Sequence, residues 1–166
     1  LRDTATVLNS TLDLDQILAR ILEIVGRVVP HDGANIMLLD GHLVRLVGCQ
    51  GYYEAVGDVE QLMSVTHDFN ETANLRYMVE TGKPCVIQDT HAETSWNQKS
   101  GSEWIRSYIG APISRGGEVI GFLNLDSKQA GFFNEKHAER LMAFADQVAI
   151  AMKLSLIHIS EPTRPY

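Results

Sequence analysis

Residues 79–96 read VETGKPCVIQDTHAETSW, residues 106–126 read RSYIGAPISRGGEVIGFLNLD, and residues 132–152 read FFNEKHAERLMAFADQVAIAM. These segments are the most informative about the fold because each has its own pattern. The first combines a helix stop with a short apolar strand and a polar loop. The second predicts two strands joined by a Gly-Gly turn, and the third predicts an amphipathic helix. The expected order is therefore strand, loop, hairpin and helix.

The first half of the chain adds helices and another hairpin. Residues 1–12 are expected to form a lead-in helix, and Asp13 to cap a second, amphipathic helix. An Asp-Gly turn at 40–41 then joins two apolar strands. Residues 54–70 have no clear pattern, and Asn70 is expected to cap a short helix.

Hairpin-linked strands imply an antiparallel arrangement. The sequence thus predicts an α+β fold with an antiparallel sheet of five or six strands and the terminal helices packed on one face.

Composition limits the classes of function. The chain of 166 residues suggests one domain, and its net charge of −7 argues against a nucleic-acid surface. The apolar runs are too short for a membrane segment. Cys49 and Cys85 have no C-x-x-C spacing and fall in apolar runs, which suggests buried free thiols and a cytoplasmic location.

The two ends of the chain suggest an excised piece of a longer protein. The sequence starts within a helical pattern and without Met. Residues 154–166 contain two prolines and break the preceding pattern, so we interpret them as a vector-derived tail.

Several short motifs occur in a defined order in the second half of the chain. They are the strand Cys85-Val86-Ile87-Gln88-Asp89, the pair Arg106-Ser107, the strand end Ala111-Pro112-Ile113, the G-x-x-I-G-x-L-x-L-D pattern from Gly117 to Asp126, and Ala149-Ile150-Ala151 in the last helix. Their combination resembles the GAF domain of bacterial signalling proteins, of the sensor histidine kinase or cyclic-di-nucleotide enzyme type. The resemblance covers about residues 9 to 153 and implies a domain at 13–153.

GAF domains bind diverse small molecules between the sheet and the loops above it, so the resemblance implies a loop-covered pocket on the second face of the sheet. The candidate ligand-binding residues are Asp89, Thr90, His91, Trp96, Trp104 and Ser107. Two interpretations stay open for some of them. Asp89 either binds a ligand or caps its own turn, and the two tryptophans either stack on a ligand or cover the core.

Members of the family that bind specialised ligands carry signature residues, and this sequence lacks several of them. Cyclic-nucleotide binders carry an N-K…F…D-E signature, whereas this chain has Ser127-Lys128 and Lys136-His137, which disfavours a cyclic nucleotide. A covalent bilin is disfavoured because no cysteine follows Cys85. Haem is disfavoured because His67 and His91 are the only candidate ligands and suit solvated loops. The histidines lack the spacing of a metal site, so we predict none, and the cofactor stays unknown.

The last helix has a second possible role. Leu141, Ala145, Val148 and Met152 follow a 4-3-4 spacing, which fits either core packing on the sheet or a homodimer contact. In the family such helices often continue into an output signalling domain. We therefore expect a non-catalytic sensory or regulatory module that binds an unknown small molecule and signals through its terminal helices. The alternatives are a structural dimerisation domain without ligand and a methionine sulfoxide reductase-like enzyme, which the cysteine positions disfavour.

Overall fold

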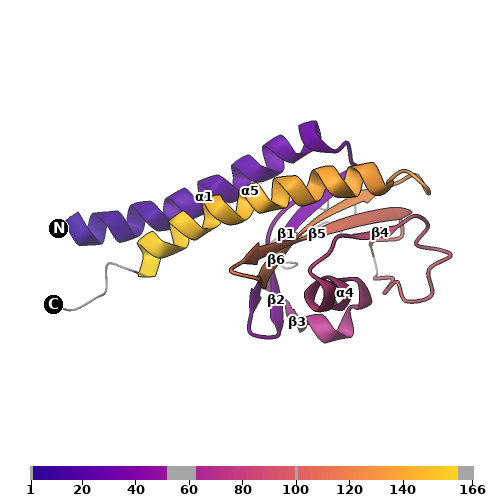
Figure 1. Ribbon diagram of the computed structural model, residues 1–166, viewed down its shortest axis with the longest axis horizontal. Helices are drawn as coiled ribbons and strands as arrows, with labels where there is room; N and C mark the ends of the chain where they lie inside the picture. The colour runs from indigo at the N-terminus through magenta and orange to yellow at the C-terminus, as the bar shows by residue number, and fades with distance from the viewer. Residues whose placement is uncertain (1, 52–62, 100, 161–166) are drawn as a thin grey trace.

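A six-stranded antiparallel sheet, in the order β3-β2-β1-β6-β5-β4, lies at the centre of the molecule (Figure 1). The structure is a computed structural model that describes residues 2–51, 63–99 and 101–160. Its elements are α1 (Arg2–Val28), β1 (Gly33–Asp40), β2 (Leu43–Gln50), β3 (Thr66–Asp68), the 3-10 turn η1 (Phe69–Glu71), α4 (Ala73–Thr81), β4 (Cys85–Ile87), β5 (Ser107–Arg115), β6 (Glu118–Ser127) and α5 (Glu135–Ser160). The predicted α+β class and strand number are confirmed.

Glycines with positive φ make the turns that the sequence predicted. Gly41 (φ 63°) lies between β1 and β2, and Gly116 and Gly117 (φ 60° and 82°) lie between β5 and β6. Gly82 (φ 66°) ends α4 in the left-handed conformation, and its N–H donates to the Met78 carbonyl oxygen over 2.8 Å. A side chain is strained at such φ values, so these four positions favour glycine.

Three local predictions differ from the structure. Asp13 lies inside α1, which is one continuous helix, so the predicted helix boundary there was wrong. Asn70 does not cap α4, because Thr72 holds that position and Asp68 accepts the Asn70 N–H instead, over 2.9 Å. Residues 66–68 form the edge strand β3, whereas no strand was predicted there. Part of the stretch 54–70, residues 54–62, lies outside the described residues.

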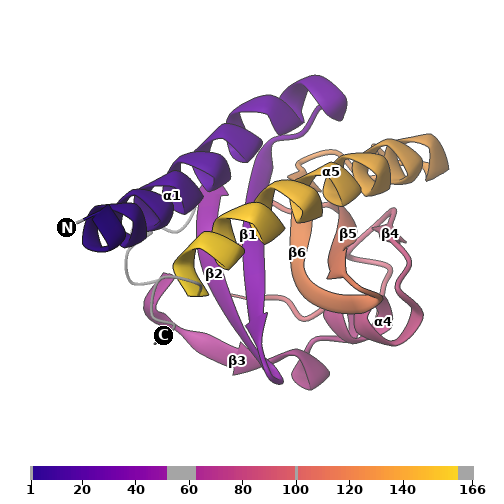
Figure 2. The same cartoon turned by 60° about the vertical axis from the view of Figure 1, so that its left-hand side comes forward.

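The two faces of the sheet have separate cores. Helices α1 and α5 lie side by side across one face, while α4 and the long β4–β5 loop lie on the other (Figures 1 and 2). Because side chains alternate along a strand, neighbouring residues serve different cores. Ile109 packs under the terminal helices, whereas the preceding Tyr108 packs under α4.

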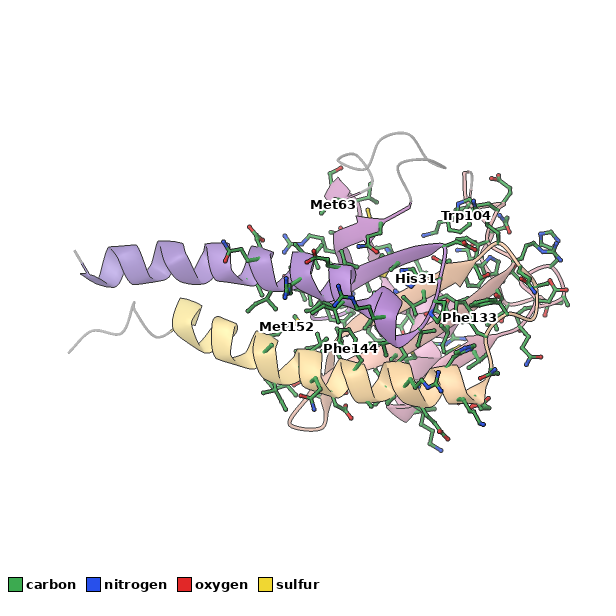
Figure 3. The ribbon with its side chains drawn as sticks, turned by 90° about the horizontal axis from the view of Figure 1, so that it is seen from above. His31, Met63, Trp104, Phe133, Phe144 and Met152 are labelled. Carbon is green, nitrogen blue, oxygen red and sulfur yellow. The ribbon has the colours of Figure 1, made fainter. Side chains whose placement is uncertain are left out.

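Leu141, Ala145, Val148 and Met152 belong to the core beneath α5, where each is at most 2% exposed. Figure 3 labels Met152 on α5, where this helix runs beside α1. Of the two roles weighed for this stripe, packing within one chain is therefore the one observed, and these side chains are not available to a partner. Helix α5 also continues to Ser160, so part of residues 154–166 is helical. None of the described helices has both the length and the apolar composition of a membrane-spanning segment.

Candidate functional site

A row of polar and small residues crosses five strands on the α4-facing side of the sheet. The strand pairing joins Cys49 to Asn35, Asn35 to Asn124, Asn124 to Gly110, and Gly110 to Cys85. Directly paired residues of antiparallel strands have side chains on the same face. These five residues, called the polar row below, therefore form a strip on this face of the sheet.

A buried hydrogen-bond chain links the polar row to α4. The Tyr108 hydroxyl donates to Asn124 Oδ1, and Asn124 Nδ2 donates to Asn35 Oδ1 over 2.9 Å. The Tyr108 oxygen also takes a hydrogen bond from the Asn74 side chain on α4. All three strand residues are at most 4% exposed. Burial, with smaller contributions from Cys85 and Asp126, raises the pKa of Tyr108 well above its ordinary value, so the phenol stays protonated as a donor.

The Tyr108 side chain occupies the space above Gly110. A Cβ atom at Gly110 would lie 2.8 Å from Tyr108 Cζ and 2.9 Å from Met78 Cε. Such distances are too short for carbon atoms that are not bonded, so a larger residue would push Tyr108 or Met78 aside. The missing side chain at Gly110 is what lets the phenol reach Asn124.

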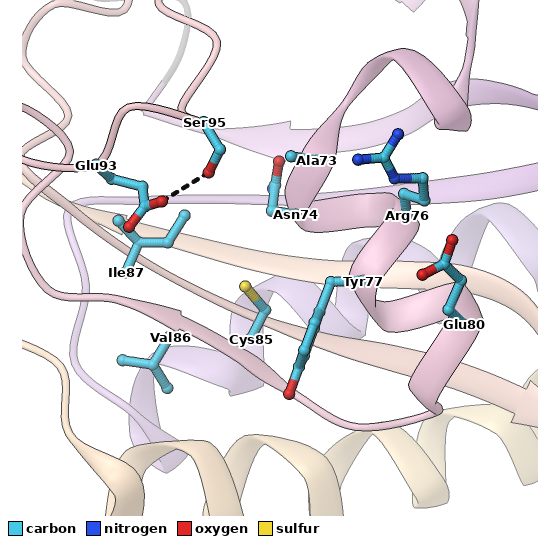
Figure 4. Close-up of a pocket in the computed structure, with 10 residues that line it drawn as sticks. All are labelled: Ala73, Asn74, Arg76, Tyr77, Glu80, Cys85, Val86, Ile87, Glu93 and Ser95. Atoms are coloured by element: carbon cyan, nitrogen blue, oxygen red, sulfur yellow. Dashed lines mark hydrogen bonds between the residues drawn. The ribbon is translucent and has the colours of Figure 1, made fainter.

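A pocket of about 370 Å³ lies at the β4 end of the polar row (Figure 4). Its walls come from α4, β4 and the loop after β4, and its lining residues are Ala73, Asn74, Arg76, Tyr77, Glu80, Cys85, Val86, Ile87, Glu93 and Ser95. Cys85 belongs to both the pocket and the polar row, and Asn74 belongs to both the pocket and the hydrogen-bond chain. The pocket and the buried polar groups are therefore parts of one site.

The two cysteines are suited to packing rather than to thiol chemistry. Burial, followed by the nearby Glu93 carboxylate, raises the pKa of Cys85 to about 11, and burial also raises the pKa of Cys49. Both thiols are therefore protonated near neutral pH. Their strands are four positions apart in the sheet, which places them about 19 Å apart at about 4.8 Å per strand. A disulfide between them would need Cα atoms within about 7 Å.

Asp89 holds its own turn together. Its Oδ1 accepts the His91 backbone N–H over 3.0 Å and lies 3.3 Å from Arg106 Nη2. The His91 hydrogen bond, followed by Arg106, lowers the pKa of Asp89 below its ordinary value. These contacts match the turn-capping interpretation of this residue.

Thr90 and Ser107 fasten loops to the end of the sheet. Thr90 Oγ1 donates to the Ile105 carbonyl oxygen over 2.7 Å, and Ser107 Oγ donates to the Gln129 carbonyl oxygen over 2.8 Å. Both residues are buried, whereas His91 is exposed. None of the six predicted ligand-binding residues lines the 370 Å³ pocket. Their contact with a ligand stays a prediction.

Both tryptophans lie over the α4-facing side of the sheet. The Trp96 ring packs on Tyr108 with ring centroids 5.3 Å apart, and its Nε1 is buried without a hydrogen-bond partner among the described residues. The Trp104 ring lies over the start of β1, where a Cβ at Gly33 would come within 2.7 Å of Cη2. Trp104 is at the end of the sheet remote from the chain termini (Figure 3). The two rings therefore cover the sheet, as one of the two interpretations proposed.

Asn35, Asn124 and Tyr108 were not among the site residues predicted from the sequence. A signal was present, because asparagine is depleted in strands and yet stands inside both ANIMLLD and FLNLD. Within residues 2–51, 63–99 and 101–160, no group of three or more His, Cys, Asp or Glu side chains could hold a metal ion.

Comparisons with known proteins place this geometry in a family. The family profile described as "GAF domain" matches residues 11–153. The GAF domain region of a putative membrane protein from Geobacter sulfurreducens PCA is 25% identical, with 89% of this chain and 98% of that chain covered and a TM-score of 0.71. The GAF domain of a phosphoenolpyruvate-protein phosphotransferase from Coxiella burnetii is 18% identical, with 93% and 94% covered and a TM-score of 0.74.

Enzymes are also among the similar structures. Free methionine-R-sulfoxide reductase from Neisseria meningitidis, solved with its substrate, is 20% identical, with 93% of this chain and 87% of that chain covered and a TM-score of 0.70. At this identity the likeness shows the fold alone. A comparison with curated proteins gave no significant match.

Proposed function

The chain belongs to the GAF domain family, and from this membership we infer that it is a non-catalytic sensory or regulatory module. In this proposal a small molecule binds beneath α4, in the pocket at the end of the polar row. The terminal helices then pass the bound state to an output signalling domain.

One observation carries the proposal: a 370 Å³ pocket is continuous with a buried chain of polar side chains. Ligand pockets typically combine an apolar wall with a few convergent polar groups. Here Val86 and Ile87 form an apolar wall of the pocket. The lining residue Asn74 is connected to Asn124 by hydrogen bonds through Tyr108. The buried Trp96 Nε1, which has no partner among the described residues, is a further donor beside Tyr108.

The sheet itself provides the route for a signal. Tyr108 and Asn124 face the pocket side, while their chain neighbours Ile109 and Leu125 are fully buried beneath α1 and α5. Any shift of β5 or β6 that accommodates a ligand therefore changes the packing of the terminal helices as well. A ligand that binds one arrangement more tightly would shift the population of the two.

An enzymatic role of the methionine sulfoxide reductase type is less well supported. Thiol catalysis needs an accessible thiolate, and a redox cycle usually needs a second thiol within reach. The raised pKa values of Cys49 and Cys85 and their position on distant strands argue against both requirements. A lack of turnover of free methionine sulfoxide in the presence of a reductant would agree with this conclusion.

Homodimerisation remains part of the proposal, with a different surface from the buried stripe on α5. The outer side of this helix exposes Ile150, whose side chain is 59% accessible. A self-association contact on the terminal helices would therefore be formed around Ile150. If the pocket binds nothing, the same contact supports the alternative of a structural dimerisation domain.

Native mass spectrometry of the purified chain tests ligand binding directly. We expect a mass excess that disappears on denaturation, because a buried small molecule leaves with the fold. The variant Asn124→Leu, which breaks the hydrogen-bond chain, should lose this excess, and Glu139→Gln, an exposed change on α5, should retain it. No excess mass, together with an unchanged melting temperature in a bacterial small-molecule extract, would contradict the proposal and favour the structural alternative.

A further inference from the structure

The chemistry of the pocket walls restricts the class of ligand, provided that the proposed binding function holds. The hydrogen-bond chain uses Asn74 as a donor, because Tyr108 gives its own hydrogen to Asn124 and so must accept from Asn74. Asn74 lines the pocket, and its side-chain oxygen takes no part in the hydrogen bond to Tyr108. It is an acceptor and needs a donor from the ligand.

Glu93 adds a charged acceptor on the opposite wall. One of its oxygens, Oε1, accepts from Ser95 Oγ over 2.7 Å, which fixes the carboxylate at the pocket rim (Figure 4). Its negative charge contributes to the raised pKa of the Cys85 thiol, and Cys85 also lines the pocket. Glu93 lines the pocket, and its carboxylate has capacity for a further donor.

The balance of charge also favours a cation. Two carboxylates, those of Glu80 and Glu93, line the pocket against one guanidinium, that of Arg76. Arg76 Nη1 donates to the Asn70 carbonyl oxygen over 3.4 Å, so part of the guanidinium is already engaged within the protein. The acceptors and the negative charge are complementary to an ammonium group with several N–H donors.

The rest of the lining suits an apolar body. Tyr77 comes from α4 and is 44% exposed, while Val86 and Ile87 come from β4. An aromatic face attracts an adjacent cation, so Tyr77 can contribute both to the apolar wall and to cation binding. Figure 4 shows Glu93 and Tyr77 on opposite sides of Cys85.

We propose that the pocket binds a small organic compound through a protonated amine, held between Glu93 and Asn74, with the carbon skeleton against Tyr77, Val86 and Ile87. Neutral alcohols and carboxylates of the same shape lack the charge that Glu93 requires and bind more weakly.

Phenylethylammonium, phenylethanol and phenylacetate are three probes that share a ring and differ in charge. Titration calorimetry of the chain should give at least about tenfold tighter binding of the ammonium compound, the size of effect expected for one charge-assisted hydrogen bond. Glu93→Gln should weaken the binding of phenylethylammonium by about tenfold. Glu139→Gln removes the same charge far from the pocket and should leave the affinity unchanged.

Three results would overturn the ammonium assignment: equal affinity for phenylethanol, equal effects of the two glutamine variants, or no binding of phenylethylammonium. These results differ from failure of the binding function. A native mass excess from a neutral or anionic compound would keep the pocket and remove only the ammonium assignment. No mass excess and no probe binding would remove both.

Discussion

Replacement of Tyr108 by Phe tests whether the hydrogen-bond chain beneath α4 stabilises the fold. The substitution keeps the ring, its packing on Trp96 and its position above Gly110, but removes the hydroxyl group. Asn124 Oδ1 then loses the Tyr108 donor. Asn74 loses an acceptor too, but it lines the pocket, where water can replace the hydroxyl.

The expected cost follows from the burial of Asn124. This residue is 3% exposed, so water cannot satisfy its orphaned oxygen. A buried polar atom left without a partner costs roughly 1–3 kcal/mol, and we expect about 2 kcal/mol for Tyr108→Phe. With an m-value of about 2 kcal/mol per molar urea, the midpoint of unfolding should fall by about 1 M.

Urea unfolding followed by far-UV circular dichroism measures this change. Tyr77→Phe is the matched control, because Tyr77 is 44% exposed and removal of its hydroxyl should change the free energy of unfolding by less than about 0.5 kcal/mol. If Tyr108→Phe shifts the midpoint no more than Tyr77→Phe does, the hydrogen-bond chain contributes nothing to stability.

Three further predictions concern the thiols, the loop after β4 and helix α5. With a Cys85 pKa of about 11, the thiolate fraction at pH 8 is about two orders of magnitude below that of an ordinary cysteine. Iodoacetamide should therefore label Cys85 far more slowly in the folded than in the urea-unfolded chain, as followed by mass spectrometry. Equal labelling rates would contradict the burial of this thiol. Because the folded pKa of Asp89 is lowered, its charge contributes stability that is complete above its ordinary pKa of about 3.9 and is lost as the pH falls through the lower folded value. In a series of urea titrations, the stability difference between the wild type and Asp89→Asn should therefore shrink only below about pH 4. A difference that does not depend on pH would refute this role of the Asp89 charge. Leu141→Ala should lower the free energy of unfolding by about 3 kcal/mol as a core truncation, whereas Ile150→Ala should lower it by less than about 0.5 kcal/mol. A larger loss for Ile150→Ala than for Leu141→Ala would place Leu141 at a surface. Ile150→Glu should weaken any self-association measured by light scattering.

Local patterns predicted most of the elements. The turns at Gly41 and Gly116 were predictable because glycine adopts a positive φ without steric strain. The boundary at Asp13 was not, although aspartate is a good cap. No Gly or Pro interrupts the sequence around it, and extending a helix is easier than nucleating a new one. The strand β3 has three residues, which is too few for any periodicity to be visible.

The candidate site was harder to predict because it depends on contacts between distant parts of the chain. The hydrogen bond from Asn124 to Asn35 joins residues 89 positions apart, and only the β1–β6 register brings them together. Asp89 and Thr90 were selected for their residue type, but the structure uses their side chains within nearby loops. Residue type gives the available chemistry, whereas strand register decides which groups meet.

The terminal helices α1 and α5 run antiparallel, so the start of one and the end of the other project past the same edge of the sheet (Figure 1). In a longer protein, the segments before and after a domain of this layout would meet it at the same edge. The domain would then lie beside the line that joins these segments and not between them. Each residue inserted into a helix continuing from α5 would turn the following segment by about 100° and advance it by about 1.5 Å. The helical phase of that junction would then decide whether a given movement of the sheet switches an attached domain on or off.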